Sequence, residues 1–198
     1  KGDIPAKVTD DYNGDFNEIK NNINNCIDGL GALVESKAVI DRMNLNDYTT
    51  RVEGKYQGIF GETAHGINGI RRRFIVAQDA NIAIAAGDFE ETLVTFRKVG
   101  QFCAEDKMLP SYISSMENIK RLVGDVNRLT EAAIGGRLDV RIDVTQHQGE
   151  YRKVMQGIND TMDAVIGPLN MAAEYIERIG KGDIPAKVTD DYNGDFNE

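Results

Sequence analysis

The string KGDIPAKVTDDYNGDFNE occupies residues 1–18 and occurs again, letter for letter, at residues 181–198. An identity of this length does not arise by chance, so we expect the chain to be a slice of a repetitive sequence, either a piece of a longer array of near-identical blocks or one 180-residue block with an overlap; its internal repeats therefore come first. A shorter period lies inside the large one. Its signature is a glycine, an aromatic residue two places later, and an Ile-Asn pair seven and eight places after the aromatic residue, as in Gly14, Phe16 and Ile23-Asn24.

This signature divides the chain into blocks of about 45 residues. One degraded copy, at Leu109, is needed to complete the series. The anchor residues are Phe16, Phe60, Leu109, Tyr151 and Phe196, spaced 44, 49, 42 and 45 residues apart. One 180-residue block is therefore about four small ones.

The residues that follow an anchor have the period of a helical coiled coil. Apolar residues recur in steps of three and four, for example at Phe16, Ile19, Ile23, Cys26, Leu30 and Leu33. Each such run predicts a helix of roughly 45 Å whose narrow apolar seam cannot bury itself without partners. The predicted seam residues are Phe16, Ile19, Ile23, Phe60, Ile67, Tyr151, Val154, Ile158, Leu169, Ile176 and Ile179.

The segments between helices, such as IPAKVTDDYNG at 4–14 and YTTRVEGKYQG at 48–58, have no helical period. Each carries two apolar residues four positions apart, which we expect to pin the connector into a groove between helices. The predicted pins are Ile4, Val8, Tyr48, Val52, Leu138, Ile142, Ile184 and Val188.

Glycines flank the connectors. A Gly-Asp pair before a connector predicts a helix stop, because glycine readily takes the left-handed conformation of a helix end. A Gly-Asp pair before the aromatic anchor predicts a helix start with Asp at or near the N-cap. The predicted junction residues are Gly2, Gly14, Gly58, Gly87, Gly149, Pro168, Gly182 and Gly194.

A helix of about 16 residues, a connector of about 12 to 14 with Gly-Asp-hydrophobic, and a second helix of about 16 resemble the HAMP domain. That module is found in bacterial and archaeal chemoreceptors, sensor histidine kinases and adenylyl cyclases. The resemblance covers nearly the whole chain, and the last 32 residues are also similar to methyl-accepting chemotaxis proteins. It implies an all-α fold of tandem units: the second half of a unit at 1–28, units at 29–74, 71–122 and 121–165, and a unit at 163–198 with a truncated second helix.

The resemblance further implies a parallel homodimer. Each unit would be a four-helix coiled coil with two helices from each chain, joined to the next unit by continuous helices. Pro168 matches the proline that commonly starts the first helix. Gly182, Ile184 and Val188 match the connector glycine and its two pins, and Glu198 fits the acidic residue near the start of the second helix.

Some units depart from the family pattern. The unit at 71–122 has a connector longer by about eight residues and places Pro110 near its second helix. Asn46 and Arg137 interrupt the Gly-Asp pair of their units. We therefore expect these units to be distorted or differently packed.

Composition and motifs argue against catalysis. Hydrophobic residues make up 41% and charged residues 28% of the chain, as in folded proteins, and the net charge of −9 disfavours nucleic acid and anionic membranes as partners. His65 and His147 have no partner at metal-ligand spacing, and no phosphate-binding loop or nucleophile motif is present. We expect no enzyme activity, no cofactor and no metal site.

The expected location is the cytoplasm. Cys26 and Cys103 lie far apart and are read as thiols in a reducing compartment. No signal peptide is visible, and the most apolar stretch, RFIVAQDANIAIAAG at 73–87, is too short to span a bilayer. The parent protein could nevertheless be anchored in an inner membrane.

The Ile-Asn pairs allow two interpretations. Asn24, Asn68 and Asn159 follow seam positions, so their amides could bond across helices and fix the register of a coiled coil. Alternatively, each amide faces water beside the seam.

The function that these features predict is signal relay by two-state repacking of HAMP units, between an upstream sensor and a downstream kinase-control or output domain of the same parent chain. One alternative is a ligand-binding helical sensor that uses the insertion of the 71–122 unit, with Phe96, Arg97, Phe102 and Cys103 as candidate site residues. Another is a passive repeat spacer or self-assembling rod.

Overall fold

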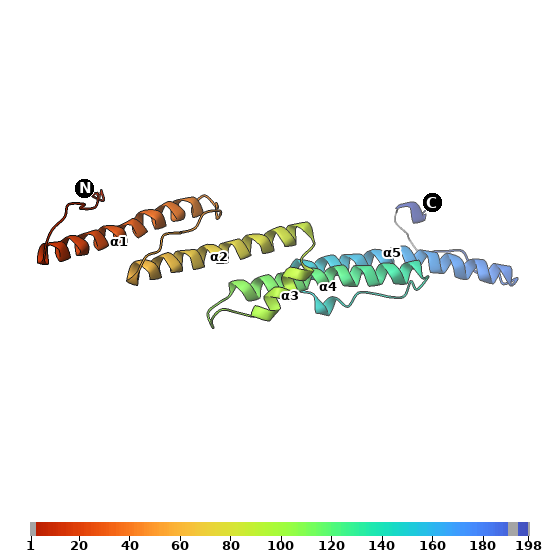
Figure 1. The fold of residues 1–198 in the computed structure, drawn as a ribbon. Helices are drawn as coiled ribbons and strands as arrows, with labels where there is room; N and C mark the ends of the chain where they lie inside the picture. Colours follow the sequence, from red (N-terminus) through yellow and green to blue (C-terminus); the bar gives the residue numbers. More distant parts are fainter. Residues whose placement is uncertain (1–2, 190–193, 198) are drawn as a thin grey trace. The chain divides into compact units, whose positions relative to one another are not determined.

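The computed structural model describes residues 3–189 and 194–197, and within these residues the chain is helical, without a β-strand (Figure 1). Its elements are α1 (Asp15–Met43), α2 (Gly58–Ala86), α3 (Glu90–Val99), α4 (Met108–Ile134), η1 (Val144–Gln146), α5 (Gly149–Gly180) and η2 (Gly194–Asn197). The predicted all-α fold is confirmed. None of the described helices is both long enough and apolar enough to cross a lipid bilayer.

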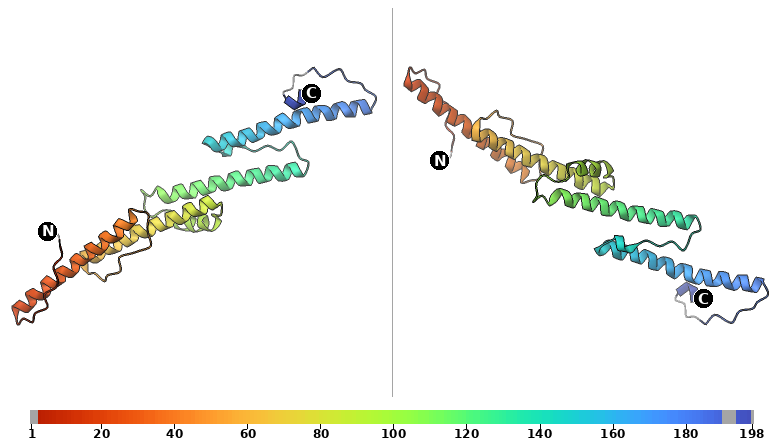
Figure 2. Two further views of the ribbon diagram at one scale, coloured as in Figure 1. Left: turned by 90° about the horizontal axis from the view of Figure 1, so that it is seen from above. Right: turned by 90° about the horizontal axis from the view of Figure 1, so that it is seen from below.

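The chain divides into two compact units, Lys1–Thr92 and Leu93–Glu198, and each contains a pair of helices that point the same way. In the first unit, residues 44–57 leave the end of α1 and run back along it, so that α2 starts beside α1 (Figures 1 and 2). In the second unit, residues 135–148 return from α4 to the start of α5 in the same manner. Each returning segment is a connector in the sense predicted from the sequence.

The buried core of each unit forms where a connector residue meets two helices. Val52, which is 5% exposed, packs with Val39 of α1 and Ala64 of α2. The corresponding cluster of the second unit contains Ile142, Leu129 and Met155. Burying one aliphatic side chain of this size contributes roughly 1.5–3 kcal/mol. The connectors are therefore part of the core.

The helices that precede connectors share one kind of C-terminal stop. In α5, the Gly182 amide donates to the Ile179 carbonyl and the Asp183 amide to the Arg178 carbonyl, both at 2.9 Å. This pair of bonds is the Schellman motif, which requires a left-handed residue after the helix. The left-handed residues are Asn46, Gly87, Gly136 and Gly182, with φ of 58°, 72°, 76° and 82°.

The expected distortion at Asn46 and Arg137 is absent from these stops. Asn46 takes the left-handed conformation in place of glycine, which asparagine tolerates better than most residues. Arg137 contributes its amide to the Ala132 carbonyl at 2.9 Å, a bond that any residue other than proline can make. Both departures from Gly-Asp therefore preserve the helix stop.

Helix starts differ from the expectation in one detail. Gly14, Gly58 and Gly149 have φ of 57°, 55° and 56°, so the chain turns sharply at these glycines. Asp15 lies in the first turn of α1, and among the described residues no side chain caps α1 by a hydrogen bond. The carboxylate of Asp15 instead lies near the positive end of the helix dipole.

Two prolines lie inside helices. Pro168 lies within α5, which continues through it from Gly149 to Gly180. Pro110, expected to disturb the 71–122 unit, lies in the first turn of α4, where a residue has no intrahelical acceptor for its amide. Neither proline ends a helix.

Candidate functional site: the connectors and the helices that hold them

Each Ile-Asn asparagine holds the backbone of one connector residue. The Val52 amide donates to Asn68 Oδ1 at 2.9 Å, and Asn68 Nδ2 donates to the Val52 carbonyl at 2.8 Å. One side chain therefore satisfies both polar groups of a buried residue, as a neighbouring strand would. We call this arrangement the asparagine clamp.

The clamp recurs at the other copies of the motif. Asn24 makes both bonds to Val8 at 2.9 Å, and Asn159 bonds the amide and carbonyl of Ile142 at 2.9 Å and 2.8 Å. Both interpretations drawn from the sequence are thus wrong. The amides neither reach across to another helix nor face water, because they are bonded to the connector of their own chain.

A carboxylate on the first helix holds the far end of the connector. Glu35 of α1 accepts hydrogen bonds from the amides of Glu53 at 2.6 Å and Gly54 at 3.1 Å, and from the Tyr56 hydroxyl at 2.8 Å. The Glu53 amide is the main cause of a lowered pKa of Glu35, and the Tyr56 and Gly54 bonds lower it further. The bond to Glu35 raises the pKa of Tyr56.

In the second unit, Asp125 and His147 occupy the repeat positions of Glu35 and Tyr56. His147 Nε2 lies 2.8 Å from Asp125 Oδ2, and both residues are at least nine-tenths buried. The other Asp125 oxygen accepts from Arg128 Nη2 at 2.6 Å. Arg121 Nη1 donates to the carbonyl of Gln146, next to His147, at 3.0 Å. The end of this connector is therefore also bonded to its first helix.

The predicted pins are buried to different extents. Val52 and Ile142 are fully buried, whereas Ile184 is 85% exposed. Tyr48 is half-buried and stacks on Phe74, with ring centroids 5.4 Å apart. Of the other predicted pins, Ile4 and Val8 are half-buried and Leu138 and Val188 are exposed.

The two copies of the repeated string differ in their contacts. Val8 is clamped by Asn24 of the helix that follows it, but the helix after Val188 is described only as η2, Gly194–Asn197. Identical sequence is thus held in one copy and exposed in the other.

Most of the predicted seam is exposed in the single chain. Ile67 and Ile158 are half-buried beside the cores. The exposed seam residues are Phe16, Ile19, Ile23, Tyr151, Val154, Leu169, Ile176 and Ile179.

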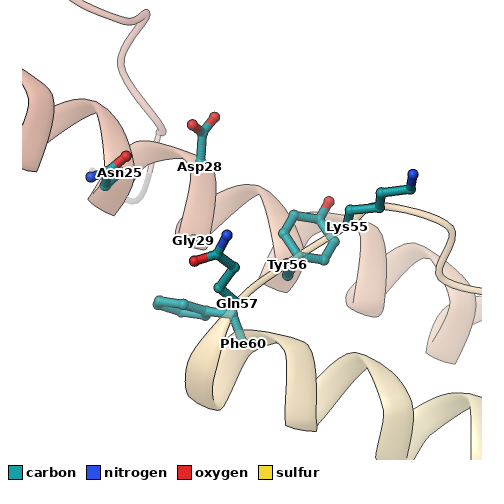
Figure 3. Close-up of a pocket in the computed structure, with 7 residues that line it drawn as sticks. All are labelled: Asn25, Asp28, Gly29, Lys55, Tyr56, Gln57 and Phe60. Atoms are coloured by element: carbon teal, nitrogen blue, oxygen red, sulfur yellow. The ribbon is translucent and has the colours of Figure 1, made fainter.

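Phe60 is half-buried and lies over a helix glycine. A hollow where the connector enters α2 is lined by residues that include Tyr56, Phe60 and Gly29 (Figure 3). A Cβ at Gly29 would lie 2.3 Å from Phe60 Cε2, so only glycine admits the ring in this position. The sequence alone does not predict this role of Gly29.

The candidate ligand-site residues of the 71–122 segment are not brought together. Phe96 is buried and meets Tyr112 edge to face at 6.2 Å, and Arg97 Nη2 donates to Glu117 at 2.6 Å. Phe102 and Cys103 are exposed. The residues expected to form a pocket therefore point into different surroundings.

In the same segment a helix replaces most of the expected extended connector. Residues Glu90–Val99 form α3, which packs on α4. Glu117 follows Leu109 by eight residues, the spacing of the clamp asparagines from their anchors, and it binds Arg97 of α3. An ion pair thus occupies the register of the asparagine clamp.

The described part of the chain contains no group of three or more His, Cys, Asp or Glu residues placed to hold a metal ion. Glu35, Tyr56 and Asp125 were not singled out from the sequence. Their positions in the repeat are a signal that the sequence does contain. Glu35 and Asp125 each lie eleven residues before the left-handed residue of their helix stop, and Tyr56 and His147 each lie two residues before the glycine that starts the next helix.

Residues 1–32 and 146–198 match the family model of the HAMP domain. The match covers both copies of the repeated string and the whole of α5, and it supports a HAMP domain in these residues. HAMP domains are signal-transmission modules, not catalytic ones, and occur in dimeric transducers between sensor and output domains. No solved structure matches the chain.

Proposed function

We propose that this chain is a signal-relay segment made of tandem HAMP units, with the unit boundaries expected from the sequence. It would connect a sensor to a kinase-control or output domain in a chemoreceptor-like transducer. The HAMP match at both ends and the repetition of the clamp at Asn24, Asn68 and Asn159 support this proposal.

The observation that carries the proposal is the exposed seam. Phe16 and Ile176 are each 71% exposed, and Ile19 is 53% exposed, although they lie on regular apolar stripes of α1 and α5. Stripes with this period are buried when a second helix pair packs against them. A parallel second copy of the chain offers the same stripe at the same height along the whole seam.

In the proposed mechanism, each unit switches between two packings of its four-helix seam. A small rotation or tilt of α1 alters the packing of the seam shared with the partner copy. The connector transmits this change to α2, because Val52 packs on both helices, Asn68 of α2 binds the backbone of Val52, and Glu35 of α1 binds the next two amides. Helices that run from one unit into the next carry the change onward.

Light scattering on the full chain tests the dimer on which this mechanism depends. We expect a dimer for the natural sequence. Replacing Ile19 and Ile23 together by Lys should shift the chain toward monomer, since charges would enter the seam. Ile59→Lys is the control, because Ile59 is 67% exposed but lies off the predicted seam. A natural chain that stays monomeric at high concentration contradicts the proposal.

A further inference from the structure

Two separate contacts attach a connector to its helices. The asparagine clamp joins the middle of the connector to the second helix, as Asn68 of α2 does at Val52. A second contact joins the end of the connector to the first helix, as Glu35 of α1 does at Tyr56. The same clamp joins Asn24 of α1 to Val8, with α1 as the second helix of that unit.

The contact to the first helix is built from different residues in the two units. Glu35 pairs with Tyr56 and Asp125 pairs with His147, each at 2.8 Å. The carboxylates share one register, the rings share another, and each carboxylate binds further donors. The contact between connector and first helix is kept although its side chains differ between the two units. This indicates that the attachment has a role of its own, whichever side chains form it.

We propose that this carboxylate–ring contact is a latch that sets how tightly the two helices of a unit are coupled. The inference rests on the proposed relay function and adds a regulatory device to it. In a latched unit the connector is bonded to both helices, so a movement of the first helix pulls on the second. In an unlatched unit the connector follows the second helix alone.

The residue eleven positions before the helix stop alternates along the chain between acidic and apolar. Glu35 and Asp125 provide the latch in 29–74 and 121–165. At the same register, Val76 occurs in 71–122 and Met171 in 163–198, and neither side chain can accept a strong hydrogen bond. The carboxylate of the latch is therefore present in the units 29–74 and 121–165 and replaced by an apolar residue in 71–122 and 163–198.

Hydrogen exchange resolved at single amides of the full chain tests the latch. Tyr56→Phe removes the hydroxyl but leaves Glu35 able to bind the Glu53 and Gly54 amides. We expect these two amides to exchange roughly tenfold faster in the variant, because the connector end loses its hydroxyl bond to Glu35 of α1 and its two remaining bonds open more often. Tyr48→Phe is the matched control, since the Tyr48 hydroxyl bonds Asn46 on the same connector. Unchanged exchange at Glu53 and Gly54 in Tyr56→Phe overturns the latch.

The second unit provides a rescue test. His147→Gln keeps a nitrogen donor near the position of Nε2, whereas His147→Leu removes it. We expect Gln to preserve the protection of the amides in 142–148 and Leu to lower it roughly tenfold. Equal protection in the two variants overturns the latch.

A separate experiment tests whether the latch couples the movements of α1 and α2, by measuring how widely the distance between the two helices varies. Spin labels on the exposed residues Ala38 of α1 and Glu62 of α2, in chains with Cys26 and Cys103 replaced by Ser and diluted into unlabelled protein, report the freedom of the two helices. Tyr56→Phe should broaden this distance distribution and Tyr48→Phe should not. Equal widths overturn the coupling. All these readouts lie within one chain, so they stay separate from a failure of the dimer in light scattering.

Discussion

At Asn24, Asn68 and Asn159, one side-chain amide binds both polar groups of a connector residue. The connector is neither helix nor sheet, so its buried backbone amides and carbonyls depend on these side chains for hydrogen-bond partners. Asparagine suits the task because its amide presents a donor and an acceptor side by side. Aspartate would keep the acceptor and lose the donor.

Replacing Asn159 by Ala should lower the free energy of unfolding by about 2–3 kcal/mol, because the buried amide and carbonyl of Ile142 lose their partner. Denaturant unfolding at fixed protein concentration measures this change. Asn170→Ala, an exposed asparagine on the same helix, is the control and should change stability by less than about 0.5 kcal/mol. Equal effects of the two substitutions would contradict the role assigned to the clamp.

The helix stop of α1 contains a carboxylate with a lowered pKa. The hydroxyl and amide of Thr49, followed by Arg42, lower the pKa of Asp47 to about 2. Because this pKa lies below the ordinary value of 3.8, Asp47 favours the folded state above that value. Its contribution is lost as the pH falls from about 4 to about 2.

Replacing Thr49 by Val should raise the pKa of Asp47 toward its ordinary value, because the largest stabilising bond of the carboxylate is removed. An NMR titration that follows the Asp47 carboxyl carbon measures the pKa. Thr50→Val should leave it unchanged. A pKa of Asp47 that stays near 2 in Thr49→Val would show that the hydroxyl is not its main cause.

Among the elements, α1 and α2 pack closely because Gly29 leaves room for Phe60. Gly29→Ala places a Cβ 2.3 Å from the Phe60 ring, whereas the nearest atom to a Cβ at Gly31 is the Tyr56 hydroxyl at 3.9 Å. Gly31→Ala should therefore stabilise the chain by about 0.5–1 kcal/mol through helix propensity. Gly29→Ala should be less stable than Gly31→Ala, since the ring must move. Thermal unfolding compares them, and the reverse order would contradict this packing.

The helices could be predicted from the sequence because their signals are local. Apolar residues spaced three and four positions apart predict where the helices run. Left-handed glycines such as Gly87 and Gly182 determine where they end. The stop at Asn46 follows the same rule with a residue that the expectation treated as a disturbance. Helix existence and approximate boundaries therefore depend on few residues.

The contacts of the connectors could not be predicted in the same way. A connector has no period, so the sequence does not show which of its backbone groups meets which helix. Asn68 and Glu35 lie on different helices and meet on one connector only after folding. The sequence does not predict α3, because the spacing between Gly87 and Leu109 indicates only a longer connector.

For the whole molecule, the exposed seams indicate that function requires a second copy of the chain. Within one chain, the connectors cover Val39 and Ala64 but leave Phe16, Ile19 and Ile176 in water. The latch and the clamp organise each chain, whereas relay requires that two chains share the seam. The direction of the partner then decides whether equivalent units meet.

The most direct test of the parallel dimer uses Cys26, which is exposed and lies three residues after the seam residue Ile23 in the same apolar period. A chain with Cys103→Ser carries one thiol for a spin label, and dipolar spectroscopy measures the distance between the labels of two copies. A parallel dimer in register predicts one distance within about three helix diameters, roughly 30–35 Å. A longer distance, as for an antiparallel pair, or the absence of dipolar coupling in a monomeric chain, would contradict the account.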